Sequence, residues 1–236
     1  MEKIYKTKAI VLARKEWREN DLLFSLFTED FGRIEAVAVG TKKIKSKLAG
    51  HLAVAGIIEI LFVKGKSFKK ITHAYLIENF FLDDYADYQY LNIAFEMINK
   101  ILSGEEKNNA LWKLLVSFSR SLIAEKAVEQ KKFLLNIFIV RLLSILGYKI
   151  KINECLNCGK PLVEHNFDYK LGGFVCRDCG RGPKIDDKVV EFIKLAEQSG
   201  KKSFALSKKN NESILDFLHK YLTYHLEIEL KAIQQV

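Results

Sequence analysis

All four cysteines of the chain lie in one short segment, and their spacing is that of a metal site. The first pair is Cys155-Leu-Asn-Cys158, and the second pair, Cys176-Arg-Asp-Cys179, follows after seventeen intervening residues. This separation is typical of a zinc site with four cysteine ligands, and a Cys-x-x-Cys turn lets two thiolates approach one metal ion at about 2.3 Å. We therefore predict one structural zinc ion bound by all four cysteines, which leaves no coordination position for an activated water.

Two disulfides or a redox dithiol are the alternative interpretations of this segment. Disulfides are disfavoured because the chain begins without a signal-peptide core, which predicts a cytoplasmic protein. A redox pair would not normally be duplicated, with a glycine directly after each second cysteine, Gly159 and Gly180. Both prolines and five of the thirteen glycines lie between residues 155 and 183, so we expect a loop-rich segment, about 150–184, that the metal organises.

A second group of residues that could do chemistry is a run of lysines in the N-terminal third. Lys42, Lys43, Lys45 and Lys47 share one predicted loop that contains no carboxylate. Four ammonium groups this close repel one another unless something anionic visits them, so the loop favours a phosphate backbone as ligand. The alternative is a solvated loop that only aids solubility.

The net charge of +9 is distributed unevenly along the 236 residues. Residues 1–82 hold 15 Lys and Arg against nine Asp and Glu, whereas the remaining two thirds together contribute only +3. A positive charge that served only solubility would be distributed evenly along the chain. The imbalance therefore favours an N-terminal surface for nucleic acid or another acidic partner.

The elements that must position these residues change in character near residue 80. Before it we expect five short strands, which suit a small closed barrel such as an OB-fold, with an SH3-like barrel as the alternative. These strands are residues 4–13, 21–28, 33–39, 52–63 and 68–77. After it, apolar residues recur at helical spacing. The helices are expected from Tyr88 to about residue 102, and at about 109–125, 130–147, 186–199 and 211–233, with Gly147 as a C-terminal cap. No apolar stretch is long enough to span a membrane.

Several separated motifs carry a resemblance to a known family. In chain order they are Leu26-Phe27-Thr28, Gly32-Arg33, Val37-Ala38, Gly40 with the lysine loop and Ser46, Arg141-Leu142-Leu143, Leu146-Gly147-Tyr148, Gly172-Gly173-Phe174-Val175-Cys176, Phe217-Leu218, Tyr221-Leu222, and Tyr224-His225-Leu226 through Glu229-Leu230-Lys231. With these motifs the chain resembles the bacterial recombination mediator family RecO over nearly its full length. One departure is that this basic loop has lysines where the family often has arginine, which weakens bidentate phosphate contacts.

The resemblance implies an α+β multidomain fold: an N-terminal five-stranded OB-fold barrel, residues 1–80, and a mostly helical domain, residues 81–236, with an inserted four-cysteine zinc finger. It also implies binding of single- and double-stranded DNA, annealing of complementary strands, and work with RecR. Together such proteins help load RecA onto single-stranded DNA that is coated by the single-stranded DNA-binding protein, SSB. Whether RecF is required is left open. Such a protein would be cytoplasmic and associated with the nucleoid.

The physical properties of the predicted barrel agree with DNA binding. OB-folds bind strands across one face, which the loops after strands 1 and 4 border, and we place basic residues and Trp17 in those loops. Trp17 is a candidate for base stacking, or else it caps the barrel core, and Arg33 could instead form a structural ion pair with Glu35 or Glu29. The DNA-binding candidates are Arg14, Lys15, Trp17, Arg18, Arg33, Lys42, Lys43, Lys45, Lys47, Lys64 and Lys66.

The family captures the acidic, apolar C-terminal tail of SSB on its helical domain. Lys131 and Lys132 precede Phe133 at the start of a predicted helix, where the family commonly has basic residues before a phenylalanine. A cation near a helix N-terminus opposes the macrodipole, which mildly favours an anionic visitor. These lysines are the candidates for SSB-tail binding, and the alternative is that they only cover a helix end.

Catalysis is not expected from this chain. It has no Gly-rich phosphate loop with a lysine, so nucleotide binding and ATP hydrolysis are not expected. An acidic cluster at Asp83, Asp84 and Asp87 could hold catalytic metal ions, but we interpret it as a solvated linker. Two other function classes remain: a zinc-ribbon DNA-binding adaptor or transcription-associated protein without annealing activity, and a nuclease that uses the acidic cluster.

Overall fold

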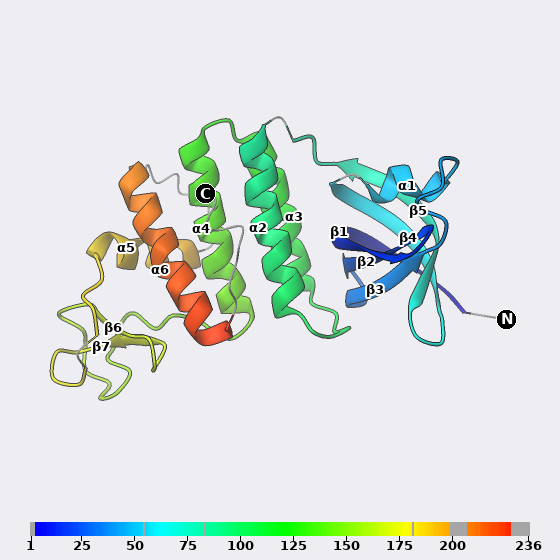
Figure 1. The fold of residues 1–236 in the computed structure, drawn as a ribbon. Helices are drawn as coiled ribbons and strands as arrows, with labels where there is room; N and C mark the ends of the chain where they lie inside the picture. Colours follow the sequence, from blue (N-terminus) through cyan, green and yellow to red (C-terminus); the bar gives the residue numbers. More distant parts are fainter. Residues whose placement is uncertain (1–2, 54, 83, 181, 199–206, 228–236) are drawn as a thin grey trace. The chain divides into compact units, whose positions relative to one another are not determined.

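The computed structural model describes residues 3–53, 55–82, 84–180, 182–198 and 207–227 (Figure 1). Its internal contacts form two compact units, of which the first ends at Ala124 and the second begins at Glu125. The first unit therefore extends past the barrel and includes the two helices that follow it in the sequence. The domain boundary near residue 80, which the change in sequence pattern suggested, stays a prediction.

The first unit contains a closed five-stranded barrel. Its strands are β1 (Ile4–Arg18), β2 (Asp21–Thr28), β3 (Gly32–Ala38), β4 (Gly56–Lys64) and β5 (Lys69–Asn79). They are hydrogen-bonded in the order β1-β2-β3-β5-β4, and β3 runs parallel to β5 while the other neighbours are antiparallel. This arrangement confirms the OB-fold. The barrel interior is filled by small and branched apolar side chains with Phe24 and Phe62.

Strand β1 is longer than predicted, because the basic stretch from Arg14 to Arg18 continues the strand instead of forming a loop. The first half of β1 pairs with β4, and the second half pairs with β2 up to Arg18 opposite Asp21. A register shift between Val11 and Ala13 follows this change of partner, and a second lies between Glu16 and Arg18; such irregularities bend a strand. The side chains of residues 13–18 are exposed, so no apolar alternation marked them as strand.

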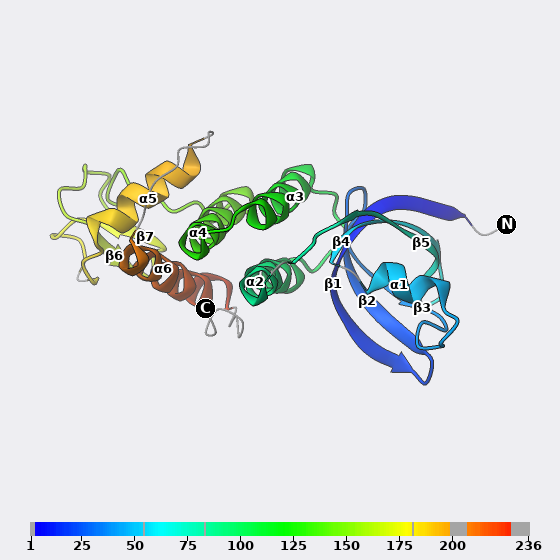
Figure 2. The same cartoon turned by 90° about the horizontal axis from the view of Figure 1, so that it is seen from above.

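A short helix, α1 (Lys47–Leu52), lies between β3 and β4 against the barrel (Figure 2). The sequence prediction missed it, since six residues are too few to show a helical period, and it started the fourth strand at residue 52 instead. Leu52 is buried in the barrel core, and Leu48 packs against the same core. Helix α1 thus begins at the last lysine of the basic loop and fixes the far end of that loop.

Helices α2 (Tyr85–Ile101) and α3 (Asn109–Ala124) complete the first unit and pack side by side. Ser25 of β2 donates to the Asn99 side chain of α2 at 2.5 Å, and the ring of Phe27 lies 5.8 Å from that of Trp112 on α3. Strand β2 is therefore buried on both faces.

The acidic cluster before α2 is only partly as predicted. Asp84 caps α2 by accepting from the backbone N–H of Asp87 at 2.8 Å. Asp87 itself is buried, so it is not part of a solvated linker, and Asp83 lies outside the described residues.

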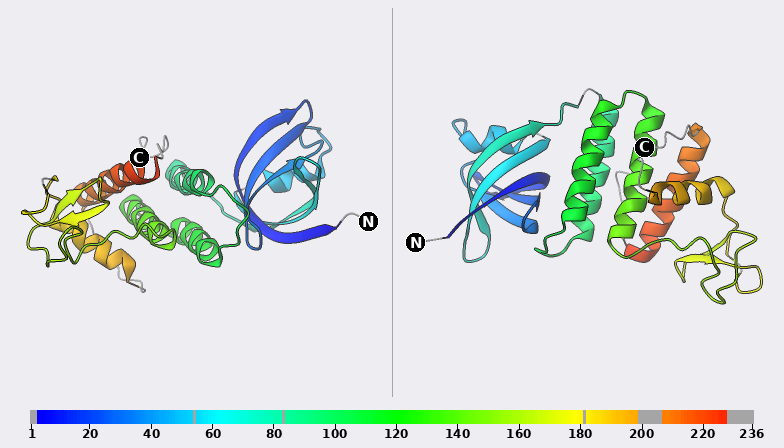
Figure 3. Two further views of the ribbon diagram at one scale, coloured as in Figure 1. Left: turned by 90° about the horizontal axis from the view of Figure 1, so that it is seen from below. Right: turned by 180° about the vertical axis from the view of Figure 1, so that it is seen from behind.

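Within its described residues, the second unit contains three helices and a small hairpin, which are also drawn in Figure 3. They are α4 (Val128–Ile145), β6 (Asn166–Asp168), β7 (Gly173–Val175), α5 (Asp187–Glu197) and α6 (Lys208–Leu226). Helix α4 ends as predicted at Gly147, whose φ is +87°. The N–H groups of Gly147 and Tyr148 bond the carbonyls of Ser144 and Leu143, which is a Schellman cap. The predicted extension of the last helix to residue 233 lies outside the described residues.

Candidate metal centre and nucleic-acid interface

The structure brings all four cysteine sulfur atoms to within 4.8 Å of one another. The Sγ atoms of Cys158 and Cys176, one from each pair, are 3.8 Å apart. Cys155 is buried, Cys158 is exposed, and the other two are partly covered. A set of four thiols on this scale is compatible with one tetrahedral metal ion.

Both Cys-x-x-Cys turns are closed by backbone hydrogen bonds. The N–H of Gly159 bonds the carbonyl of Cys155 at 2.8 Å, and the N–H groups of Cys179 and Gly180 bond that of Cys176 at 3.0 and 3.2 Å. The two glycines serve different needs. Gly159 has a φ of +72°, whereas a side chain at Gly180 would meet that of Val175.

Electrostatics explain why a cation fits among these sulfur atoms. The backbone N–H of Cys176, helped by those of Cys158 and Asn157, lowers the pKa of the Cys155 thiol to about 6. Hydrogen bonding to the sulfur atoms of Cys176 and Cys158 favours the protonated form of Cys179 and raises its pKa to about 12. Four thiolates this close would repel one another, a bound cation would relieve that repulsion, and thiolates select soft metal ions.

An aromatic cluster holds the cysteine segment to α6, and the sequence prediction missed it. Phe167 of β6 and Phe174 of β7 are fully buried with their rings 5.0 Å apart. The ring of Phe167 also lies 4.9 Å from that of Phe217 and 5.9 Å from that of Tyr221, both on α6. A bound metal would therefore not be the only organiser of the segment. The signal in the sequence that could have predicted this cluster is the presence of two phenylalanines in an otherwise loop-rich stretch.

The lysine loop between β3 and α1 is held by a series of backbone contacts. The N–H of Gly40 bonds the Asp21 carboxylate at 2.8 Å, and the N–H of Lys42 bonds the carbonyl of Asn20 at 3.1 Å. The Lys42 ammonium group pairs with Glu16 of β1 at 2.8 Å, so a neighbouring strand supplies a carboxylate that the loop itself lacks. Lys43, Lys45 and Lys47 are exposed.

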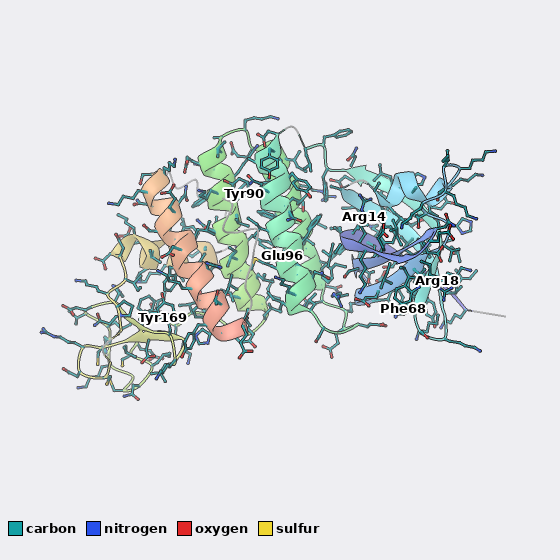
Figure 4. All side chains as sticks on the ribbon, viewed as in Figure 1. Arg14, Arg18, Phe68, Tyr90, Glu96 and Tyr169 are labelled. Carbon is teal, nitrogen blue, oxygen red and sulfur yellow. The ribbon has the colours of Figure 1, made fainter. Side chains whose placement is uncertain are left out.

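An aromatic pair lies at the end of β1, where Trp17 is next to Arg18 in the sequence. Trp17, near the end of β1, keeps 38% of its surface exposed and meets Phe68 of the β4–β5 turn edge to face at 4.6 Å. Phe68 is labelled in Figure 4 with Arg14 and Arg18, which project from the same barrel. The contact joins the end of β1 to the turn that contains Lys66 and follows Lys64, the last residue of β4; both lysines are exposed.

A hollow of about 460 Å³ opens between β1, the lysine loop and α1. Three of the DNA-binding candidates are among the residues that line it. Arg14 and Lys15 contribute to one wall and Lys42 to another, while Leu22 and Phe24 contribute apolar surface. We use the name basic rim for the exposed DNA-binding candidates of the barrel taken together, which are Arg14, Lys15, Trp17, Arg18, Lys42, Lys43, Lys45, Lys47, Lys64 and Lys66. Its role in DNA binding stays a prediction.

Arg33 is engaged inside the first unit. Its guanidinium pairs with Glu35 at 3.2 Å and donates from Nε to the Asn99 side chain at 2.9 Å, with 18% of the side chain exposed. This is the structural ion pair that the sequence offered as the alternative. A contact between Arg33 and DNA stays a prediction. The guanidinium would have to contact DNA while it also keeps its bonds to Glu35 and Asn99.

Lys131 and Lys132 lie in the first turns of α4 and are only 1% and 5% exposed. Both have interaction partners within the chain. Nearby, Asn211 of α6 donates to the backbone carbonyl of Glu129 at 3.0 Å. An acidic peptide could reach the two ammonium groups only after covering side chains move, and their role in SSB-tail binding stays a prediction.

None of the helices among the described residues is long and apolar enough to cross a membrane.

Comparison with known proteins gives the family. Residues 1–80 match the family model "Recombination protein O N terminal", and residues 82–233 match "Recombination protein O C terminal". A DNA repair protein RecO from Dehalococcoides mccartyi strain CBDB1 is 29% identical over 97% of this chain and 93% of its own length. That of Caldanaerobacter subterraneus subsp. tengcongensis is 27% identical, with 96% and 95% covered. One from Clostridium acetobutylicum is 30% identical, with 75% and 72% covered. The chain therefore belongs to the RecO family of DNA repair proteins.

Proposed function

We propose that this protein is a mediator of recombinational DNA repair that binds single- and double-stranded DNA and anneals complementary strands. The observation that carries the proposal is the basic rim on an OB-fold barrel, in which the ring of Trp17 packs against that of Phe68. Lysine and arginine neutralise phosphates, and an exposed aromatic ring can stack on a base of any sequence. This combination suits binding that depends little on sequence, as an annealing protein needs.

Annealing follows from charge neutralisation without any catalytic residue. Two complementary strands repel one another through their phosphates, and a surface that neutralises phosphates on both lowers that repulsion. We therefore propose that the protein acts by binding alone, without nucleotide and without an enzymatic step. In the cell it would act with RecR to help RecA replace SSB on single-stranded DNA in the cytoplasm, at the nucleoid, and the same scheme leaves room for RecF as a further partner.

We also propose that the metal is zinc, one ion per chain, held by Cys155, Cys158, Cys176 and Cys179. The support is the four-sulfur donor set and the two closed Cys-x-x-Cys turns. Zinc bound by four thiolates has no open position, so its contribution is to hold the segment folded.

Strand annealing by the purified protein is the deciding experiment. Mixing complementary oligonucleotides with the protein, in the absence of magnesium and nucleotide, should accelerate duplex formation over the protein-free rate. The strands should remain uncut when magnesium is then added. Binding of DNA without acceleration would favour the zinc-ribbon adaptor, and cleavage with magnesium would favour a nuclease.

Docking of the SSB tail provides a separate test on the second unit. If the acidic tail reaches Lys131 and Lys132, Lys131→Glu together with Lys132→Glu should weaken the binding of a fluorescent tail peptide by about tenfold or more. Because both side chains are buried, the double variant could lose stability, so its thermal melting must be measured alongside. The milder Lys132→Gln is a second variant that we expect to stay folded. Unchanged peptide affinity in a folded double variant would place the docking site elsewhere on the protein.

A further inference from the structure

The tip of the lysine loop carries an apolar side chain that is fully exposed. Ile44 has the same accessible surface as in an extended peptide, with a relative exposure of 105%. Its neighbours in the sequence, Lys43 and Lys45, are both exposed lysines. Exposed apolar side chains are common singly, but here one stands at the centre of the most basic loop of the chain.

The exposure of Ile44 follows from how the loop is built. On its near side the hydroxyl of Thr41 donates to the carbonyl of Ala38 at 2.5 Å, and the N–H of Lys43 bonds the carbonyl of Gly40 at 3.1 Å. On its far side the N–H of Ser46 bonds the carbonyl of Lys43 at 2.9 Å, directly before α1 begins. These bonds form a tight turn around residues 43–46, and the turn holds Ile44 away from the barrel core.

The surroundings of Ile44 indicate which kind of ligand would cover it. Residues 39–50 contain no acidic side chain, and the Glu16 carboxylate is already paired with Lys42. A ligand on this tip must therefore offer apolar surface flanked by negative charge. A DNA strand offers this in its bases and phosphates, and proteins that unstack DNA insert side chains such as isoleucine between bases.

We propose that Ile44 is a wedge that inserts between neighbouring bases of a bound DNA strand while Lys43 and Lys45 hold the flanking phosphates. This inference rests on the proposed DNA-binding function and adds a role that charge alone does not provide. A strand that is held unstacked at this point presents the pairing edges of its bases, so the wedge would promote annealing as well as affinity.

The test uses the full-length protein and an oligonucleotide that contains 2-aminopurine, whose fluorescence rises when it is unstacked. Wild-type protein should raise the fluorescence on binding. Ile44→Ser should lose most of this rise and bind about fivefold more weakly, near the lower end of the range for one stacked base. The dependence of its affinity on salt should stay the same, because no charge is changed. Ile44→Leu should behave as wild type.

Val163 provides a matched control, because it is a branched apolar residue of the second unit that is 93% exposed. Val163→Ser should change neither the fluorescence nor the affinity. The wedge proposal is overturned if Ile44→Ser protein binds and unstacks DNA as wild type does. This holds even if the variant loses binding to RecR. If wild-type protein binds no DNA, the proposed function fails together with the wedge.

Discussion

Exchanging Cys176 for Ser is expected to remove the bound metal and to lower the stability of the second unit by about 4 kcal/mol or more. The remaining three thiolates form an incomplete tetrahedron, and metal binding to such segments can supply on the order of 10 kcal/mol. The buried rings of Phe167 and Phe174 would then be uncovered, so aggregation should accompany the loss. Metal analysis by mass spectrometry and thermal melting measure the two effects.

Asp178 offers a control inside the same Cys-x-x-Cys turn, because it is exposed and is not a ligand candidate. Asp178→Asn protein should keep one zinc ion per chain and melt as wild type does. Removing the metal from wild-type protein with a strong chelator should reproduce the Cys176→Ser result. Purified wild-type protein that holds no metal and is fully stable would show that the cysteines are not a metal site.

Reversing the charge of Lys43, Lys45 and Lys47 to Glu should weaken binding of single-stranded DNA by on the order of a hundredfold at low salt. If wild type neutralises about five phosphates, log K should fall with log salt at a slope near −3.5, and the variant should flatten that slope by about 2. Lys42 is left unchanged because a glutamate there would face Glu16. Fluorescence anisotropy over a series of salt concentrations gives both quantities.

Three exposed lysines elsewhere, Lys113, Lys194 and Lys208, form the matched control for this variant. Changing them to Glu alters the net charge by the same amount, so any effect of total charge appears in both proteins. Melting temperatures should stay near that of wild type for both, since the side chains are exposed. Equal losses of affinity in the two variants would mean that DNA binding does not depend on the lysine loop.

The sequence predicted the parts of this protein that depend on local patterns. Short apolar strands separated by turns predicted the five-stranded barrel, and the structure confirms it. The spacing of the two Cys-x-x-Cys pairs predicted that the four thiols lie together, as they do. Gly147 was recognisable as a helix end because a residue with positive φ is needed there. Each of these features is marked by a pattern in the residues that form it.

The remaining features depend on contacts between distant parts of the chain, which no local pattern reports. Arg14 to Arg18 form a strand because β2 pairs with them, although their side chains are exposed. The Trp17–Phe68 contact joins residues about fifty positions apart. Lys131 and Lys132 looked like surface residues from their type, and only the packing of the second unit shows that they are buried.

The aromatic contact between the cysteine segment and α6 has a consequence for biosynthesis. Chains fold from the N-terminus as they emerge from the ribosome, so the segment around Phe167 emerges before Phe217 and Tyr221 do. During that interval the rings of Phe167 and Phe174 lack the helix that later covers them. All four cysteines, in contrast, precede α6 in the sequence, so they emerge before it. Early metal capture would therefore hold the hairpin in shape, and protect the nascent chain from aggregation, until α6 arrives.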